Sequence, residues 1–277
     1  MKKRKQNTKK QFPKKTVIYI SVFILLFAIL IFLSTTVFAR VANKLACEKD
    51  FEDFTKKNQK TVFSIDKCVL FSNCNVSNKD GLVTNLKVDD LFQYTDIALF
   101  INNNSNENTL ENTLKSVKID NIEFTTKPSV GEQKLYYKNI NSFAEGIIPS
   151  EDNLIEKDLD FSISSKDNEN LNTPTLYNNC ANPITLSYVN DKIKTDYGIS
   201  NVSGSITYDG SLLKMCNVML SSLNAKISFD IYITNNLNQE FKCSVFIDIP
   251  VEKDGKSLYD GAISKEEKSN FKFIRIK

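Results

Sequence analysis

Hydrophobic residues occupy every second position along much of the chain between residues 61 and 277. The clearest case is 227–233, where every odd position is isoleucine or phenylalanine, and the same alternation returns over 241–249 after a short Asn-rich segment. Alternation of this kind predicts a strand with one buried face. Together the two segments predict an antiparallel hairpin. Pro250 ends its second strand because proline has no N–H to donate to a ladder.

Further segments with strand-forming residues follow the same pattern. They are 61–72, 82–88, 96–101, 116–124, 135–138, 159–163, 184–188 and 271–276. Four of the 8 glycines follow an aspartate, and Asp-Gly pairs favour tight turns. One of these pairs, Asp209-Gly210, predicts a second hairpin between 206–208 and 212–213. Roughly ten short strands separated by turns predict an all-β antiparallel β-sandwich of the immunoglobulin-like or a related kind.

The sequence leaves the number of sandwiches open. Segments 95–103 and 229–236 share an Asp-Ile start, alternating apolar residues and an Asn-Asn turn, as a repeat would. In that interpretation the polar stretch 164–172 links two abutting sandwiches of about 100 residues each. Similar strands also arise without duplication, and one β domain can exceed about 200 residues. One elaborated sandwich over 61–277 fits the pattern equally well.

The stretch 17–39 is apolar and uncharged, in contrast to the alternating pattern that follows it. At about 1.5 Å per residue it is long enough to cross a hydrocarbon core of about 30 Å, and it predicts one transmembrane helix in contact with the lipid bilayer. Eight cations lie in the basic tail 1–16. The positive-inside rule places this tail in the cytoplasm and the C-terminal domain outside the cell membrane.

Two alternatives concern processing of this N-terminal segment. Val37-Phe38-Ala39 has the small residues that signal peptidase accepts, but the apolar run exceeds the roughly 7–15 residues of a signal peptide. A retained signal-anchor is therefore favoured over cleavage after Ala39. Lipidation of Cys47 is disfavoured, because Lys44 stands where that motif requires an apolar residue.

Segment 40–60 has helical rather than alternating spacing. Val41 and Leu45 are four residues apart, and Cys47, Phe51 and Phe54 continue the apolar face between charged residues. This spacing predicts a short juxtamembrane amphipathic helix. Its favoured role is the first element packed on the extracytoplasmic region, ahead of a spacer or a pairing surface for a partner helix.

Charge is distributed unevenly along the chain. All 33 acidic residues follow Ala46, so the extracytoplasmic region is acidic and the overall charge of +3 arises from cations beside the membrane. Nucleic acid is therefore not predicted as a partner. A hydrophobic content of 41%, with 19 Phe and 10 Tyr, is sufficient for a packed core.

All 6 cysteines lie beyond the apolar run, on the side of a membrane where disulfides persist. Sequence cannot select among their connectivities. The short spacing of Cys68 and Cys74, and the neighbouring strand positions of Cys216 and Cys243, suggest these two pairs as disulfides. Histidine and Cys-x-x-Cys pairs are both absent, so we predict no metal site and no cofactor.

The same absence of histidine excludes Ser-His-Asp, Cys-His and histidine-based acid–base catalysis. Ser-x-x-Lys occurs at 64–67 and 211–214, but the companion Lys-Thr-Gly motif of penicillin-binding enzymes is missing. No catalytic residue is therefore predicted.

These observations predict a single-pass, membrane-anchored envelope protein that displays a non-catalytic β-sandwich for binding, adhesion or assembly. Its extracytoplasmic partner is a protein or a glycan that the sequence does not identify. A second hypothesis is a cleaved, secreted subunit of a surface fibre, in which sandwich edges pair between chains. A third is a glycan-directed enzyme that uses paired carboxylates, such as Asp158 with Asp160 or Asp89 with Asp90.

Overall fold

The computed structural model divides the chain into two compact units, Met1–Asn58 and Gln59–Lys277. The residues that the structure describes are 62–77, 87–105, 107, 109–164, 175–177, 183–199, 206–267 and 271–277 in the second unit, and 18, 19, 22, 23, 25–27, 37, 39–47 and 49 in the first.

The described residues of the N-terminal unit are all helical. No helix among them is both long enough and apolar enough to cross a membrane. The predicted basic tail at 1–16 lies outside the described residues, as do most of the predicted transmembrane helix at 17–39 and the second half of the juxtamembrane helix at 40–60.

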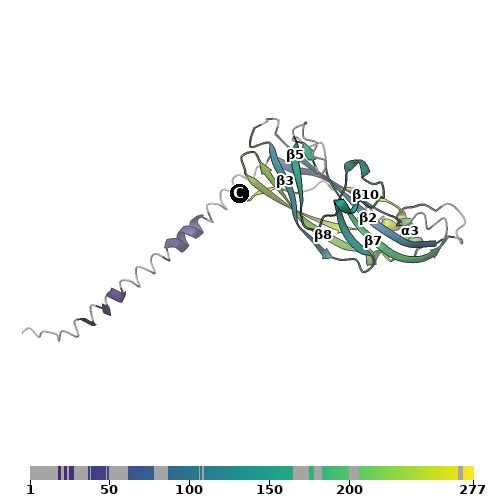
Figure 1. The fold of residues 1–277 in the computed structure, drawn as a ribbon, viewed down its shortest axis with the longest axis horizontal. Helices are drawn as coiled ribbons and strands as arrows, with labels where there is room; N and C mark the ends of the chain where they lie inside the picture. The colour runs from purple at the N-terminus through teal and green to yellow at the C-terminus, as the bar shows by residue number, and fades with distance from the viewer. Residues whose placement is uncertain are drawn as a thin grey trace, which may run out of the picture. The chain divides into compact units, whose positions relative to one another are not determined.

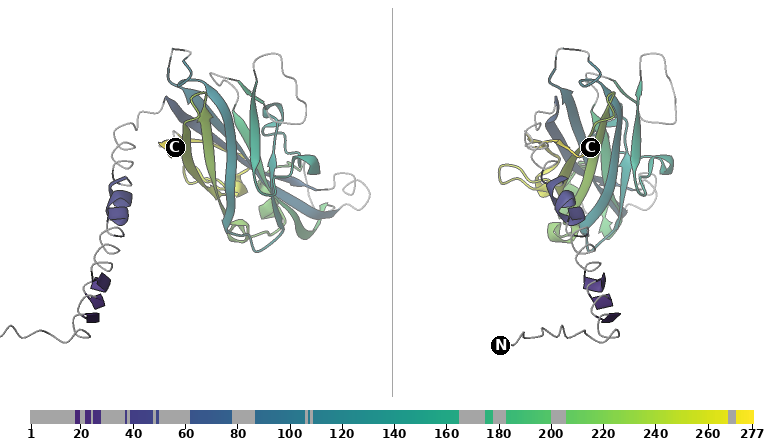
Figure 2. Two further views of the ribbon diagram at one scale, coloured as in Figure 1. Left: turned by 60° about the vertical axis from the view of Figure 1, so that its left-hand side comes forward. Right: turned by 90° about the vertical axis from the view of Figure 1, so that its left-hand side faces the viewer.

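The second unit is a β-sandwich of two sheets, whose strands Figures 1 and 2 show as the coloured arrows. Sheet A has the strand order β10 (Ile263–Glu267), β1 (Phe63–Val76), β2 (Lys87–Asn103), β7 (Ile184–Gly198) and β4 (Glu132–Tyr137). Sheet B has the order β11 (Ile274–Arg275), β9 (Glu240–Ile249), β8 (Ala225–Asn235), β3 (Leu114–Thr126), β5 (Leu159–Ser164) and β6 (Thr175–Tyr177). The described helices are short: η1 (Ile140–Ser142), η2 (Glu151–Asn153), α3 (Ser211–Met215), η4 (Leu220–Leu223) and η5 (Leu258–Asp260).

The strands form one sandwich rather than two in succession. Sheet A pairs β1 with β10, and sheet B pairs β3 with β8, so each sheet combines strands from both halves of the sequence. The predicted antiparallel β-sandwich is confirmed, with one parallel pair between β5 and β6. Most of the polar stretch 164–172, the predicted linker, lies outside the described residues.

The main core lies between the two sheets. Alternate residues of a strand point to opposite faces, so Ile97, Leu99 and Ile101 of β2 meet residues such as Ile231 and Val245 from sheet B. The predicted hairpin is confirmed as β8 and β9, which pair without a bulge from Ala225↔Ile249 to Thr234↔Glu240. The burial of every odd residue from Phe241 to Ile249 is the physical cause of the alternation in the sequence.

The second predicted hairpin, around Asp209-Gly210, is wrong. Ser211–Met215 forms the helix α3 instead of a strand. The Asp209 carboxylate accepts a hydrogen bond from the Ser211 N–H at 2.9 Å, and the Asp209 carbonyl accepts one from the Leu212 N–H at 3.0 Å. These local bonds start a helical turn, which buries Leu212 and Leu213 in a second hydrophobic cluster.

Candidate functional site

Along one edge of strand β9, the described residues provide a pairing partner only at the start of the strand. One side of β9 pairs with β8 throughout, whereas on the other side β11 pairs only with Phe241 and Lys242 among the described residues. The edge from Ser244 to Asp248 thus has no described strand beside it.

Hydrogen bonds at the start of β9 show which backbone groups face this edge. The Glu240 N–H donates to the Lys277 carbonyl at 3.2 Å, and the Ile276 N–H donates to the Glu240 carbonyl at 2.8 Å, so the backbone of Glu240 points away from β8. Successive residues of an antiparallel strand bond to opposite sides. Residues 244, 246 and 248 consequently present their N–H and C=O groups at the open edge. Pro250, the next residue of this series, has no N–H to offer.

A groove of about 610 Å³ lies beside the open edge. Its lining includes residues 246–249 of β9, Leu70 of β1, and Lys265 and Glu267 of β10, and it continues around the end of β9 to Ala225 and Lys226 of β8. The Phe246 side chain also lines it and is 70% exposed. Unpaired backbone groups along an edge are a template for an added strand. This edge and its groove are therefore the candidate binding site.

A polar cluster on β8 and β9 fixes the outer surface next to the edge. Asp230 accepts hydrogen bonds from Asn121 at 2.8 Å and Ser244 at 2.5 Å, and pairs with Lys242 at 2.8 Å. Burial acts to raise the pKa of Asp230, but the hydrogen bonds from Lys242, Ser244 and Asn121 outweigh it and hold the pKa below its ordinary value. Asp230 therefore stays ionised and holds β8, β9 and Asn121 of β3 together.

The outer face of sheet A is covered by a strap, residues 138–155. The strap includes η1 and η2, and it returns to β4 where the Ile155 N–H donates to the Leu135 carbonyl at 2.9 Å. Its residues Ile148 and Leu154 pack on an outer cluster that contains Tyr94 and Tyr136. The strap thus protects apolar residues of sheet A that would otherwise face water.

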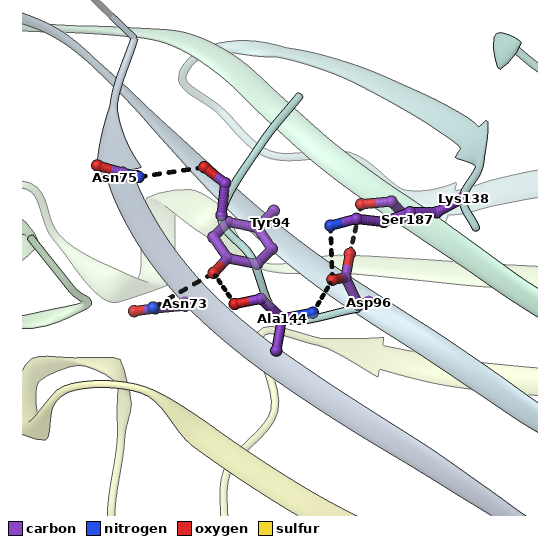
Figure 3. Close-up of polar contacts among 8 residues, drawn as sticks. Asn73, Asn75, Tyr94, Asp96, Lys138, Ala144 and Ser187 are labelled. Atoms are coloured by element: carbon purple, nitrogen blue, oxygen red, sulfur yellow. Dashed lines mark hydrogen bonds and ion pairs between the residues drawn. The ribbon is translucent and has the colours of Figure 1, made fainter. Parts of the chain in front are cut away.

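A buried ion pair fixes the strap to the sheet (Figure 3). Lys138 Nζ lies 2.8 Å from Asp96 Oδ2, and the two side chains are 3% and 0% exposed. The same carboxylate accepts hydrogen bonds from the Ser187 hydroxyl at 2.6 Å and from the Ala144 N–H at 2.8 Å. Asp96 on β2 therefore connects β7 with two points on the strap, and its charge is neutralised by Lys138.

Tyr94 makes a second set of contacts under the strap (Figure 3). Its hydroxyl accepts a hydrogen bond from Asn73 at 3.3 Å and donates to the Ala144 carbonyl at 3.5 Å. Burial raises its pKa to about 12, so the hydroxyl stays protonated and keeps its donor. Asn75 donates to the Gly146 carbonyl at 3.1 Å. A side chain at position 146 would place its Cβ 3.0 Å from the Tyr94 hydroxyl, so glycine fits closely here.

The constellation of Asp96, Lys138 and Ser187 contains groups that catalyse reactions elsewhere, but all three are buried. Ser187 is 0% exposed, and its hydroxyl donates to Asp96 at 2.6 Å. The contacts of this arrangement hold the strap on sheet A. Among the described residues, no group of His, Cys, Asp and Glu is placed to hold a metal ion.

The structure does not bring the suggested disulfide partners together. None of Cys68, Cys74, Cys216 and Cys243 is joined to another cysteine in the structure. Cys68 and Cys74 are six residues apart on β1, which corresponds to about 20 Å of strand, beyond the reach of a disulfide. Cys216 belongs to the cluster around α3, whereas Cys243 lies in the main core.

The residues considered for catalysis have other partners. Asp158 pairs with Lys118 at 2.7 Å, and Asp90 pairs with Lys194 at 2.7 Å. Of the two Ser-x-x-Lys serines, Ser64 donates to Asp66 and Ser211 donates to Asp209, each at 2.5 Å. These contacts tie the groups to neighbouring residues of the fold.

Sequence reasoning missed both Asp96 and the open edge of β9. The sequence did contain a signal for Asp96, because segments 95–103 and 229–236 share an aspartate at the start of an apolar strand. In the structure these aspartates, Asp96 and Asp230, each pair with a lysine on the outer face of a sheet. A charged residue inside an otherwise apolar strand requires a partner.

Comparison with protein-family models, with curated proteins and with solved structures finds no significant match to this chain.

Proposed function

We propose that this is a single-pass envelope protein that displays its sandwich outside the cell membrane and binds, without catalysis, an extended polypeptide segment along the open edge of β9. The apolar stretch 17–39 and the eight cations before it support the anchor and its orientation. The partner is a protein segment in strand conformation, with main-chain hydrogen bonds supplying affinity.

The observation that carries the proposal is the open edge itself. In the part of the chain that the structure describes, no strand pairs with the backbone of residues 244, 246 and 248 on this side, and the last two of these line the groove of about 610 Å³. Side chains at alternate positions of a bound segment would enter this groove or lie over Phe246, which gives a basis for specificity.

Photo-crosslinking in intact cells tests the proposal. With p-benzoylphenylalanine placed singly at positions 244, 246 and 248 of the full chain, we expect crosslinks to one partner segment. Because strands pair residue by residue, the crosslinked position should move by about two residues for each step of two along β9. Peptide mapping by mass spectrometry measures this shift.

Position 219 provides the control, because Met219 is 67% exposed, close to the 70% of Phe246, but lies outside the edge. Crosslinks from 244, 246 and 248 that scatter over unrelated segments, or that recur from position 219, would contradict strand addition.

The same open edge also favours the fibre-subunit hypothesis, in which the added strand comes from another copy of this chain. In that case the crosslinked peptides belong to this chain, and the native protein begins at Arg40 after cleavage behind Ala39. A partner segment from a different chain, together with a retained N-terminus, supports the anchored display protein instead.

A further inference from the structure

Two cysteines lie in the same hydrophobic cluster at the end of the sandwich that contains α3. Cys74, on β1, is fully buried in this cluster, and the half-buried Cys216 packs against it directly after α3. The Gly210 N–H donates to the Asn73 side-chain oxygen at 2.8 Å, which holds the start of α3 against the residue next to Cys74. The five residues of α3 then lead back to Cys216.

Cys216 also belongs to the electrostatic surroundings of Cys74. Burial is the main cause that raises the pKa of Cys74, and the second cause is the charge of Cys216. Among the described residues, no second cysteine acts on the pKa of the other two strand cysteines: burial and Glu267 raise the pKa of Cys68 to about 12, and burial and Asp230 raise that of Cys243 to about 11. Among the described cysteines, Cys74 and Cys216 are thus the pair that the fold brings together.

We propose that Cys74 and Cys216 form a disulfide that ties β1 to the end of α3. The inference rests on the proposed function in one respect, namely that the sandwich lies outside the membrane, where disulfides persist. The two residues are separated by roughly 140 residues, and a crosslink that closes so long a loop restricts the unfolded chain strongly.

The bond forms by exchange with a small-molecule or protein disulfide, which supplies the oxidising equivalents. The Cys216 thiolate attacks this oxidant and releases one of its sulfurs as a thiol. The Cys74 thiolate then displaces the second sulfur, so two protein S–H bonds are lost, one S–S bond is formed and the oxidant becomes two thiols. Burial raises the pKa of both thiols, which slows the exchange in the folded protein. We therefore expect the bond to form while the chain folds.

The test compares full-length protein isolated from cells with the same protein refolded in reduced and oxidised glutathione. Both samples are denatured, alkylated without reduction, digested and mapped by mass spectrometry. The expected product is a linked peptide pair containing Cys74 and Cys216. Cys216→Ser should release Cys74 as an alkylated thiol, whereas the matched Cys243→Ser should leave the linked pair intact.

Two outcomes separate this inference from the proposed function. Alkylation of Cys74 and Cys216 after refolding with oxidised glutathione, or linkage of Cys74 to a different cysteine, overturns the pair. If Cys74 and Cys216 are linked after refolding but both are reduced in protein from cells, the proposed pairing stands. The same result contradicts the proposed extracytoplasmic location.

Discussion

Lys138→Met is expected to lower the free energy of unfolding by ~3–5 kcal/mol, because it leaves the Asp96 carboxylate buried without its cation. The strap from 138 to 155 should loosen first, since Lys138 and Ala144 both bind this carboxylate. Urea unfolding of the full chain in nonionic detergent measures the effect. Urea is preferable to guanidinium because it is uncharged and leaves the exposed ion pairs of the protein unscreened.

The control is Lys192→Met, which removes the cation of an exposed pair. Lys192 Nζ lies 2.7 Å from Glu132, and both side chains are 56% exposed, so the loss should not exceed ~1 kcal/mol. Adding Asp96→Asn to Lys138→Met should restore part of the stability by removing the unpaired charge. Equal effects of the two methionine variants would contradict a buried ion pair under the strap.

Phe229→Ala is expected to destabilise the sandwich by ~3–5 kcal/mol, because Phe229 is 1% exposed and its removal leaves a cavity between the sheets. Phe246→Ala changes the same residue type on the adjacent strand, but there the ring is 70% exposed. Its effect on stability should stay within ~0.5 kcal/mol. Urea unfolding curves of the two variants supply the comparison. A loss at Phe246 as large as that at Phe229 would mean that the face of sheet B carrying Phe246 is also buried.

Strands with one buried face could be predicted from their alternation of apolar and polar residues, whereas β2 and β7 are buried on both faces along much of their length. The hairpin of β8 and β9 follows directly from the odd-numbered apolar residues that fill the core. The pairing of strands could not be predicted in the same way. For example, β1 lies between β2 and the distant β10, a contact set by the whole chain rather than by local pattern.

The helix α3 shows where local pattern misleads. Asp209-Gly210 between apolar residues has the sequence of a hairpin turn, yet the Asp209 carboxylate and carbonyl start a helical turn there. Burial of Leu212 and Leu213 in the cluster of Cys74 then favours the helix over a strand.

The candidate site and the ion pair depend on contacts that are distant in sequence. Lys138 is 42 residues from Asp96, and many other lysines were available as its partner. The open edge of β9 results from two facts of topology, that β11 has only two residues and that β10 pairs with β1 in the other sheet. Neither fact has a signature in the sequence of β9 itself.

Residue-level hydrogen–deuterium exchange of the isolated protein tests the open edge of β9 most directly. The amides of residues 244, 246 and 248 should exchange rapidly, because no strand in the described part of the chain accepts their N–H groups, while those of 243, 245 and 247 should be protected by β8. Uniform protection from 243 to 248 would show that this edge is already covered within the chain and would contradict the proposed strand-binding site.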